Sequence, residues 1–241
     1  MICSLTIVRY PKWFGWAGFL SMALFRFPLW FNKNIHFWKL LGCGKNGTFD
    51  KRPDWRQWGV LLVWSEKSAV WNPDKNISAS RLQSPYLFRT WWKFFRCETW
   101  TIALEPIEGH GTWDGKQCFG ELPMQTDCNG MIGILTRATI RMNKLGRFWE
   151  HVNGVADRMT TAGGFITSFG IGEIPWIKQA TFSVWESREH MKQFAYRSKE
   201  HADVIRKTRE EKWYSEDMFI RFRVLHTHGS LQGKDPLDRN S

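Results

Sequence analysis

The sequence predicts an α+β fold in which two tandem β-α-β-β-α-β repeats, each a ferredoxin-like unit, form one α+β barrel. The first observation is an internal recurrence. Residues 165–185 contain a strand-like run ending in Gly-x-Gly, a loop, and a second strand-like run ending in Val-Trp, and residues 35–64 repeat this order. The second observation is that the strand and helix patterns follow one another in the same order in both halves of the chain. Such a recurrence predicts a duplicated folding unit.

In the first repeat, residues 1–106, alternating and β-branched residues predict four strands at 4–10, 35–41, 58–64 and 99–104. Helices are expected at 13–26 and 85–95. The polar stretch 45–56 is predicted to be a loop, and the Asn-Pro-Asp at 72–74 ends any helix that begins at Ser65.

Residues 107–130 are predicted to be a connecting loop, because glycine recurs there and no period is sustained. The second repeat, residues 131–225, then gives strands at 132–141, 165–170, 178–185 and 217–224, and helices at 143–159, 186–196 and 198–212. Asn143 is expected to cap the first of these helices. Gly170 and Gly172 are predicted to turn the backbone with φ > 0. Residues 226–241 are predicted to be a loose polar tail.

The composition bounds the chemistry. The chain has 241 residues with 16 Trp and 18 Phe, which is more flat apolar surface than a core of this size needs. A pocket for a large apolar or planar ligand is one interpretation, and an aromatic-rich core is the other. The net charge of +11 is scattered and follows no nucleic-acid motif, so we expect no nucleic-acid partner.

Two further features bear on the compartment. The five cysteines form no Cys-x-x-Cys and are odd in number, which predicts a reduced, cytoplasmic protein without a disulfide framework. Residues 13–31 are nearly all apolar, but Arg26 and Pro28 interrupt them. We expect a buried helix there, with peripheral contact at the inner membrane left open.

A set of ordered motifs resembles the spheroidene monooxygenase family, the acyclic carotenoid 2-ketolases of purple photosynthetic bacteria. The resemblance covers most of the chain from Ser4 to about Phe222 and is strongest from Thr136 onward. The motifs are Gly42-x-Gly44, Ser84-Pro85, Trp100-Thr101, Gly111-x-Trp113-x-Gly115, the run 136–141, Phe148-Trp149, the runs 170–176 and 179–185, and Phe194-Ala195-Tyr196 leading to His201 and Arg206.

The resemblance implies a haem-containing monooxygenase that hydroxylates or ketolates carbon 2 of an acyclic carotenoid such as spheroidene. It would hold haem b iron and take O2 as co-substrate and electrons from a ferredoxin-like donor. The family is similar in fold to dimeric α+β barrel haem proteins such as aldoxime dehydratase and chlorite dismutase, and a homodimer is left open. The alternatives are a non-catalytic protein that binds haem or an apolar ligand, and a different haem enzyme on the same fold.

Within that resemblance, His201 is the first candidate for the axial iron ligand, because a helix is a rigid mount for it. The alternative is an ordinary helix histidine. His151, His190, His110 and Cys43 are weaker candidates. His226-x-His228 has metal-like spacing without a third partner and is interpreted as surface.

Three arginines are candidates to pair with haem propionates: Arg137, Arg141 and Arg206. Arg137 and Arg141 are expected to face the same side of one strand, which is either the pocket or solvent. The candidates for lining the substrate pocket are Trp149, Phe169, Trp176, Gln179, Phe182 and Trp185. Core packing is the alternative for each of the aromatic residues.

Overall fold

A computed structural model describes residues 1–45, 52–65, 84–197, 207–208 and 210–238, and the side chains among them except 151–157 and 196–197. The first repeat contains β1 (Ile2–Arg9), α1 (Gly15–Leu24), α2 (Arg26–Phe31), β2 (Ile35–Gly44), β3 (Pro53–Trp64), α3 (Tyr86–Phe94) and β4 (Glu98–Gly111). The second contains β5 (Ile132–Ile140), α4 (Leu145–Thr160), β6 (Phe165–Ile174), β7 (Lys178–Trp185), α5 (Arg188–Arg197) and β8 (Tyr214–Gly229).

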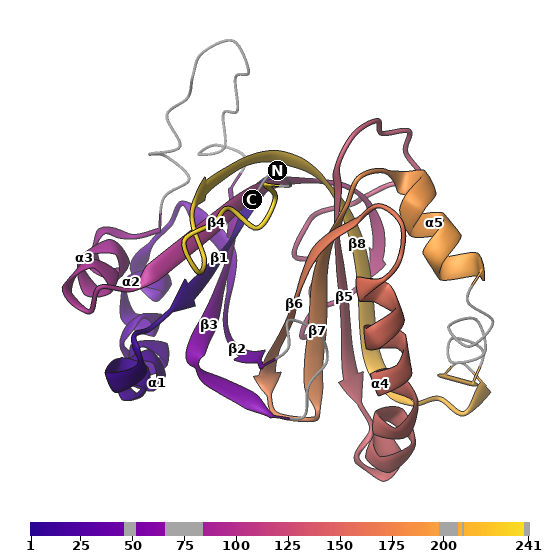
Figure 1. The fold of residues 1–241 in the computed structure, drawn as a ribbon, viewed down its shortest axis with the longest axis horizontal. Helices are drawn as coiled ribbons and strands as arrows, with labels where there is room; N and C mark the ends of the chain where they lie inside the picture. Colours follow the sequence, from indigo (N-terminus) through magenta and orange to yellow (C-terminus); the bar gives the residue numbers. More distant parts are fainter. Residues whose placement is uncertain (46–51, 66–83, 198–206, 209, 239–241) are drawn as a thin grey trace.

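The eight strands close into one antiparallel barrel in the order β1-β3-β2-β6-β7-β5-β8-β4. The first repeat supplies β4-β1-β3-β2 and the second supplies β8-β5-β7-β6 in the matching order. This is the strand order that two β-α-β-β-α-β units give when their edges join, so the predicted fold class is confirmed (Figure 1).

The two joins between the repeats are unequal. Strands β4 and β8 pair from Trp100↔Gly229 to Gly111↔Met218. Strands β2 and β6 pair only at Gly42↔Gly172 and Cys43↔Ile171. We call this short join the seam.

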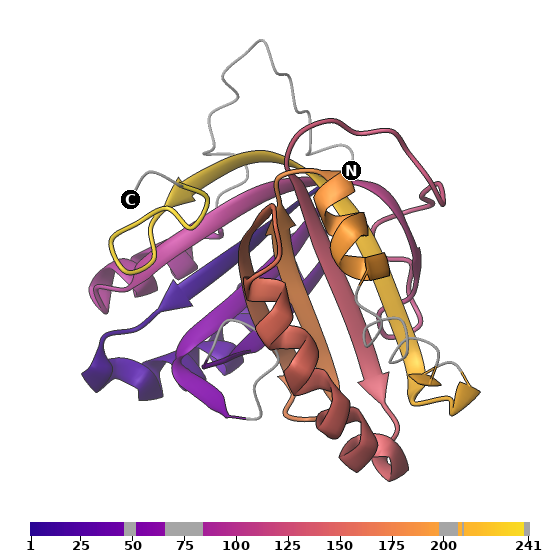
Figure 2. The same ribbon diagram turned by 45° about the vertical axis from the view of Figure 1, so that its right-hand side comes forward.

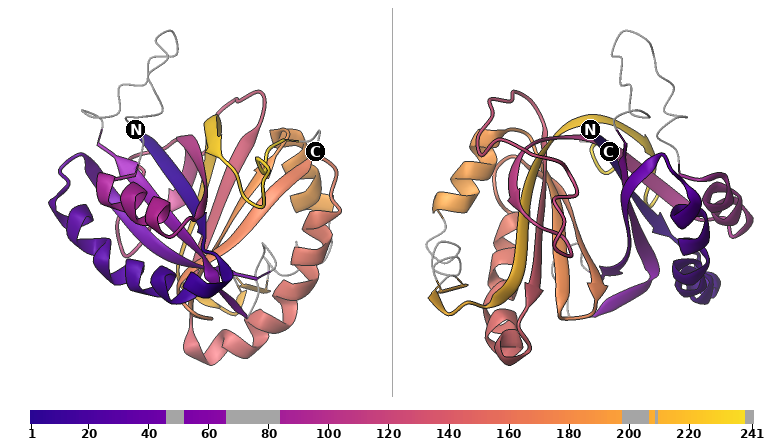
Figure 3. Two further views of the ribbon diagram at one scale, coloured as in Figure 1. Left: turned by 60° about the vertical axis from the view of Figure 1, so that its left-hand side comes forward. Right: turned by 180° about the vertical axis from the view of Figure 1, so that it is seen from behind.

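Side chains alternate between the barrel interior and its outer surface, as strand geometry requires. The interior is filled by apolar residues from both repeats, including Leu5, Leu61, Trp100, Phe169 and Phe222. Helices α1, α2 and α3 cover the outside of the first repeat, and α4 and α5 cover the outside of the second (Figures 2 and 3). The layers are therefore helix, sheet, sheet and helix around one shared core.

Several predicted elements differ from the structure. The single buried helix expected over 13–26 is wrong: α1 and α2 are separate, and only one side of them is buried, at Ala17, Gly18, Ser21 and Leu29. Asn143 does not cap α4, whose N-cap position is Lys144 with no side-chain hydrogen bond. The helix expected over 198–212 lies largely outside the described residues, as does the chain that follows Ser65.

The Gly-x-Gly segments are strand rather than loop. Strand β2 runs through Gly44 and β6 runs to Ile174, and neither Gly170 nor Gly172 has a positive φ. A Cβ at Gly172 would lie 2.8 Å from the Lys178 carbonyl oxygen. Glycine is needed here for close approach of backbones, so the predicted role in turning the chain is wrong.

Both stretches that the sequence assigns to loops at the ends of strands are partly ordered. Strand β4 continues to Gly111 and absorbs the start of the connecting loop. Strand β8 continues to Gly229 and absorbs the start of the tail. Beyond it, Asp235 accepts hydrogen bonds from Trp100 Nε1 at 2.9 Å and Thr227 Oγ1 at 2.6 Å, which fixes residues 230–238 against the barrel.

Candidate functional site

The outer face of the second repeat carries one row of residues that are register partners on neighbouring strands. From β6 to β4 the row is Gly170, Thr181, Thr136, Phe219 and His110. Thr136 lies at the middle of β5, flanked by β7 and β8, yet it is exposed. We call these five residues the Thr136 row. Among the described side chains, the face is therefore uncovered at Thr136, although α4 and α5 lie over the sheet (Figure 2).

Apolar clusters bury the face on both sides of the Thr136 row. One contains Ile132, Ile134, Met159, Trp185 and Met191, and the other contains Ile140, Phe148, Trp149 and Trp213. Helix α4 contributes residues to both clusters, so it is anchored near each end. The uncovered part of the face lies between these two anchors.

The floor of the uncovered part is made of small side chains. Thr136, Thr181 and Ala138 leave room above the sheet, and Gly170 adds no side chain. The Thr181 Oγ1 atom is buried and has no hydrogen-bond partner within the described part of the chain. A buried polar atom without a partner is rare in a finished core. These features fit a site that a flat, largely apolar group completes.

Two buried arginines lie beside this row. Arg221 is the register partner of Ile134 and Glu108, and its guanidinium pairs with the Glu108 carboxylate. Arg188 Nη2 lies 3.6 Å from the same carboxylate, and its Nη1 donates to the Thr126 carbonyl at 2.6 Å. Each guanidinium has a buried Nε without a hydrogen-bond partner among the described residues. Arg188 Nη1 also lies 3.6 Å from the Asp127 carboxylate, so two carboxylates balance the two guanidinium groups on this side of the sheet.

Sequence reasoning missed these charges. Glu108 falls in the stretch predicted to be loop. Arg188 lies among charged residues at the predicted start of a helix, a pattern that is typical of an exposed helix end. The alternation of Phe219, Arg221 and Arg223 along one strand face was the available signal. It did not reveal which of the arginines is buried.

A pocket of about 220 Å³ opens at the seam. Its rim includes Phe19, Trp55, Trp58 and Trp176, and its floor includes Gly170, Gly172 and Gln179. Gly170 is also the β6 member of the Thr136 row, two strands from Thr136, which is about 10 Å. The seam pocket and the uncovered face therefore adjoin.

Arg137 has a different place from the one expected. It points into the barrel, is 1% exposed, pairs with Glu216, and lies over the Trp113 ring at 5.5 Å. Its Nη2 is 3.7 Å from Asp114 and 3.8 Å from Glu173. Protein carboxylates therefore already balance its charge.

The carboxylates at this end of the barrel are held ionised. Burial by itself raises the pKa of Glu216, but hydrogen bonds from the Gly115 amide, Arg137 and Thr112 outweigh it and lower the pKa to about 2. Burial likewise opposes ionisation of Asp114, and hydrogen bonds from Lys178 and Lys39 still bring its pKa down to about 2. The cluster is an ion-pair network that closes the barrel end.

Arg141 does not share a side with Arg137, so that expectation is wrong. Strand β5 ends at Ile140, and the chain then turns into the 3-10 helix before α4. Arg141 is exposed and its Nε donates to the Tyr214 carbonyl at 3.2 Å. Tyr214, whose carbonyl it contacts, packs its side chain against the Ile140 cluster.

The candidate iron ligands fall in several places. His201, with Arg206, lies outside the described residues, as does the side chain of His151. His190 Nδ1 lies 3.2 Å from Ser187 Oγ and 3.5 Å from Glu186. His110 lies on β4 rather than in a loop, is exposed, and stacks on Phe219 with ring centroids 6.0 Å apart.

The remaining donors are poor ligands as they stand. Burial raises the pKa of the Cys43 thiol to about 12, which disfavours the thiolate that iron would need. His226 and His228 are exposed on β8, consistent with the surface interpretation. Within the described ranges, no group of three His, Cys, Asp or Glu side chains could hold a metal ion.

The six residues proposed to line a pocket do not form one surface. Trp176 and Gln179 line the seam pocket. Phe169 and Phe182 point into the barrel core. Trp149 and Trp185 belong to the clusters on either side of the Thr136 row.

These features define a class: a single-chain, two-repeat α+β barrel whose second repeat exposes Thr136 at the middle of its outer face. A solved aldoxime dehydratase in complex with butyraldoxime has the same fold, with a TM-score of 0.59 at 9% identity over 93% of this chain and 79% of that one. Residues 132–225 match a family described as a domain of unknown function, DUF3291.

The sequence relatives are more specific. The spheroidene monooxygenase of Rhodobacter capsulatus is 32% identical over 98% of this chain and 95% of its own length. That of Cereibacter sphaeroides is 32% identical over 83% of this chain, which spans 59% of that relative's length. The chain belongs to the spheroidene monooxygenase family.

Proposed function

We propose that this protein is a haem-dependent monooxygenase that oxidises carbon 2 of an acyclic carotenoid such as spheroidene. The observation that carries the proposal is the 32% identity to a spheroidene monooxygenase over nearly the full length of both chains. The oxidant is O2, and the electrons come from a ferredoxin-like donor. The net charge of +11 favours an acidic partner protein.

The residues at the Thr136 row fit haem b. A porphyrin is flat and mostly apolar, and the floor of Thr136, Ala138 and Thr181 is both small and bounded by aromatic clusters. His201 is the proposed axial ligand. Arg206 and Arg141, of which Arg141 is exposed, are the proposed partners of the propionates. Arg137 is less suited to that role, because Glu216 already pairs with it.

When bound, the haem iron supplies the activation of O2 that the oxidation of an unactivated carbon requires. The chain contributes position and environment. The buried Arg188 and Arg221 lie beside the face, and each has an Nε–H without a partner among the described residues that can donate to a bound group. The two flanking clusters exclude water from both ends of the row.

The seam pocket is the proposed place for the carotenoid end. Its rim of four aromatic side chains suits a conjugated hydrocarbon, and its Gly170 is the neighbour of Thr181 in the Thr136 row. The Gln179 amide is held by the Ile174 carbonyl, its Nε2 donating at 3.1 Å, so it does not swing into the pocket. A polyene end held there lies next to the proposed haem face.

The test uses the purified full chain with added haemin. We expect a Soret band, and a spheroidene product that carries one additional oxygen as a hydroxyl or, with loss of two hydrogens, as a keto group when ferredoxin, its reductase and O2 are present. A protein that binds haem but leaves the carotenoid unchanged is a carrier or a different haem enzyme. A protein that takes up no haem contradicts the proposal outright.

A further inference from the structure

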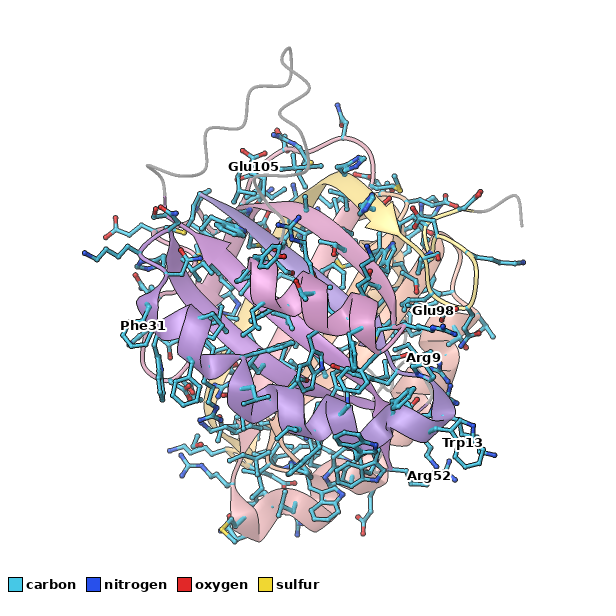
Figure 4. The ribbon with its side chains drawn as sticks, turned by 90° about the vertical axis from the view of Figure 1, so that its left-hand side faces the viewer. Arg9, Trp13, Phe31, Arg52, Glu98 and Glu105 are labelled. Atoms are coloured by element: carbon cyan, nitrogen blue, oxygen red, sulfur yellow. The ribbon has the colours of Figure 1, made fainter. Side chains whose placement is uncertain are left out.

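The three helices of the first repeat present an outward surface of large aromatic side chains. On α1, α2 and the residues just before them, Trp13 is 79% exposed, Trp30 63% and Phe31 80%. The surface also includes Trp16, Phe19, Phe27, and Tyr86, Leu87 and Phe94 of α3. We call these residues the aromatic face. Trp13 and Phe31 mark its two ends in Figure 4.

Helix α1 has its small residues on the buried side and its large apolar residues on the exposed side. The buried side of α1 consists of Ala17, Gly18 and Ser21, and its large residues point away from the protein. Gly18 is needed for this packing, because a Cβ there would lie 2.2 Å from Trp58 Nε1. Small residues thus bring α1 close to the sheet while the aromatic rings are left outside. A water-facing helix has the opposite arrangement.

The aromatic face is continuous from helix to helix. Phe95 lies between α3 and the start of α1, with its ring 5.8 Å from Trp16 and 5.0 Å from Phe94. Phe27 and Trp30 are in edge contact at 5.9 Å. A contiguous exposed apolar patch of this kind marks an interaction surface.

Helices α1, α2 and α3 carry charge of one sign only. Arg9, Lys12, Arg26, Lys33, Lys39 and Lys45 precede the first acidic residue of the chain, Asp50. Helix α3 and the two residues after it add Arg89, Lys93 and Arg96, and none of α1, α2 and α3 contains an acid. Of these cations, Lys12, Arg26, Lys33, Arg89, Lys93 and Arg96 are exposed around the aromatic rings.

The geometry points to an anionic phospholipid bilayer as the occupant of the aromatic face. Tryptophan and phenylalanine rings with surrounding Lys and Arg are the composition that binds the headgroup and upper acyl region of a bilayer. Helices α1 and α2 have 10 and 6 residues and are therefore too short to cross a bilayer. On this proposal they lie in the plane of the membrane–water interface. Among the described residues, no helix is long and apolar enough to cross a membrane.

The second repeat gives an internal contrast. Within the described side chains of α4 and α5, none is an exposed Trp or Phe. The aromatic face therefore belongs to one side of the molecule, and docking through it leaves the Thr136 row away from the bilayer. Phe19 also lines the seam pocket, so on the proposed function a polyene can reach that pocket from the bilayer along aromatic rings.

The experiment is flotation of the full chain with vesicles of phosphatidylcholine alone or phosphatidylcholine with phosphatidylglycerol. The aromatic variant is Trp13→Ser/Trp30→Ser/Phe31→Ser, with Met124→Ser/Met142→Ser as the control that removes exposed apolar residues elsewhere. The charge variant is Lys12→Gln/Arg26→Gln/Lys33→Gln. Its control, Lys116→Gln/Lys212→Gln/Lys234→Gln, removes the same charge from other exposed positions.

We expect the wild type to float with the anionic vesicles and the aromatic variant to be lost from them. The charge variant should bind about fivefold more weakly per cation removed, and both controls should bind as the wild type does. Unchanged thermal unfolding establishes that each variant is folded. The proposal is overturned if the folded aromatic variant binds the anionic vesicles as well as the wild type does, or if a control variant loses as much binding as the variant that it matches. The proposal is also overturned if light scattering shows that the wild type is a dimer, and if Trp30→Ser dissociates this dimer without changing vesicle binding.

Discussion

Gly42 of the first repeat pairs directly with Gly172 of the second, in the two-residue ladder that closes the barrel. Each glycine belongs to its own repeat's Gly-x-Gly, so the recurring segments meet each other at the seam. The neighbouring pair is Cys43 and Ile171, the middle residues of the two motifs. The duplication therefore pairs the two Gly-x-Gly motifs with each other.

The close packing of β6 against β7, next to the seam, predicts the effect of adding a side chain at Gly172. Gly172→Val places its Cβ 2.8 Å from the Lys178 carbonyl oxygen, so either β6 or the β6–β7 turn must move. We expect a loss of about 2 kcal/mol in the free energy of unfolding, measured by urea denaturation. Gly146→Ala is the control, since a Cβ there meets nothing within 4 Å. An unchanged urea midpoint for Gly172→Val contradicts the close packing of β6 against β7 at this position.

The ion pair inside the barrel makes a second prediction. Glu216→Gln leaves the buried Arg137 without its nearest carboxylate. Removing one partner of a buried pair should destabilise the fold by about 3 kcal/mol. Glu150→Gln, at an exposed position of α4, is the matched control and should change little. Equal urea midpoints for the two variants would show that the network contributes nothing.

The same network predicts acid sensitivity. The pKa values of Asp114 and Glu216 fall from their ordinary 3.8 and 4.5 to about 2 in the folded state. A lowered folded-state pKa stabilises the protein above the ordinary pKa, and that stabilisation is lost as the pH falls from about 4.5 to about 2. Urea midpoints across this window should drop steeply for the wild type and less for Glu216→Gln. Parallel curves for the two proteins would refute the assignment.

The uncovered face predicts a selective loss of haem. Thr136→Trp fills the space above the centre of the sheet, and Thr136→Ser leaves it open. Because Thr136 is exposed, the free energy of unfolding without haem should change by no more than about 0.5 kcal/mol in either variant. Haem bound per chain, measured by absorbance, should fall sharply in Thr136→Trp only. Full haem content in that variant would place the cofactor elsewhere.

Much of the fold could be predicted because strand and helix periodicities are local. Strand β7 was predicted at its observed bounds, residues 178–185. The order of strands and helices was also predicted for the described residues, except that one helix was expected where α1 and α2 are separate. The seam could not be predicted, because Gly-x-Gly has the same sequence signature in a turn and in a strand that another strand approaches closely. Only the pairing of Gly42 with Gly172 distinguishes the two.

The site could be predicted only in part. Trp176 and Gln179 lie at the seam pocket, but Phe169 and Trp185 lie on opposite sides of the sheet. The alternation of side chains along a strand assigns consecutive residues to opposite faces of the sheet, but it does not predict which part of a face a helix covers. The exposure of Thr136 depends on where α4 is anchored, and nothing in residues 132–140 encodes that.

The central claim is that this chain transfers oxygen from O2 to an acyclic carotenoid. The most direct measurement is mass spectrometry of spheroidene after incubation with the haem-loaded protein, a ferredoxin, its reductase and isotopically labelled O2. The account predicts a product carrying one labelled oxygen, formed by the wild type and lost in Thr136→Trp. Unlabelled, unchanged spheroidene from a wild-type preparation with a full Soret band would contradict it.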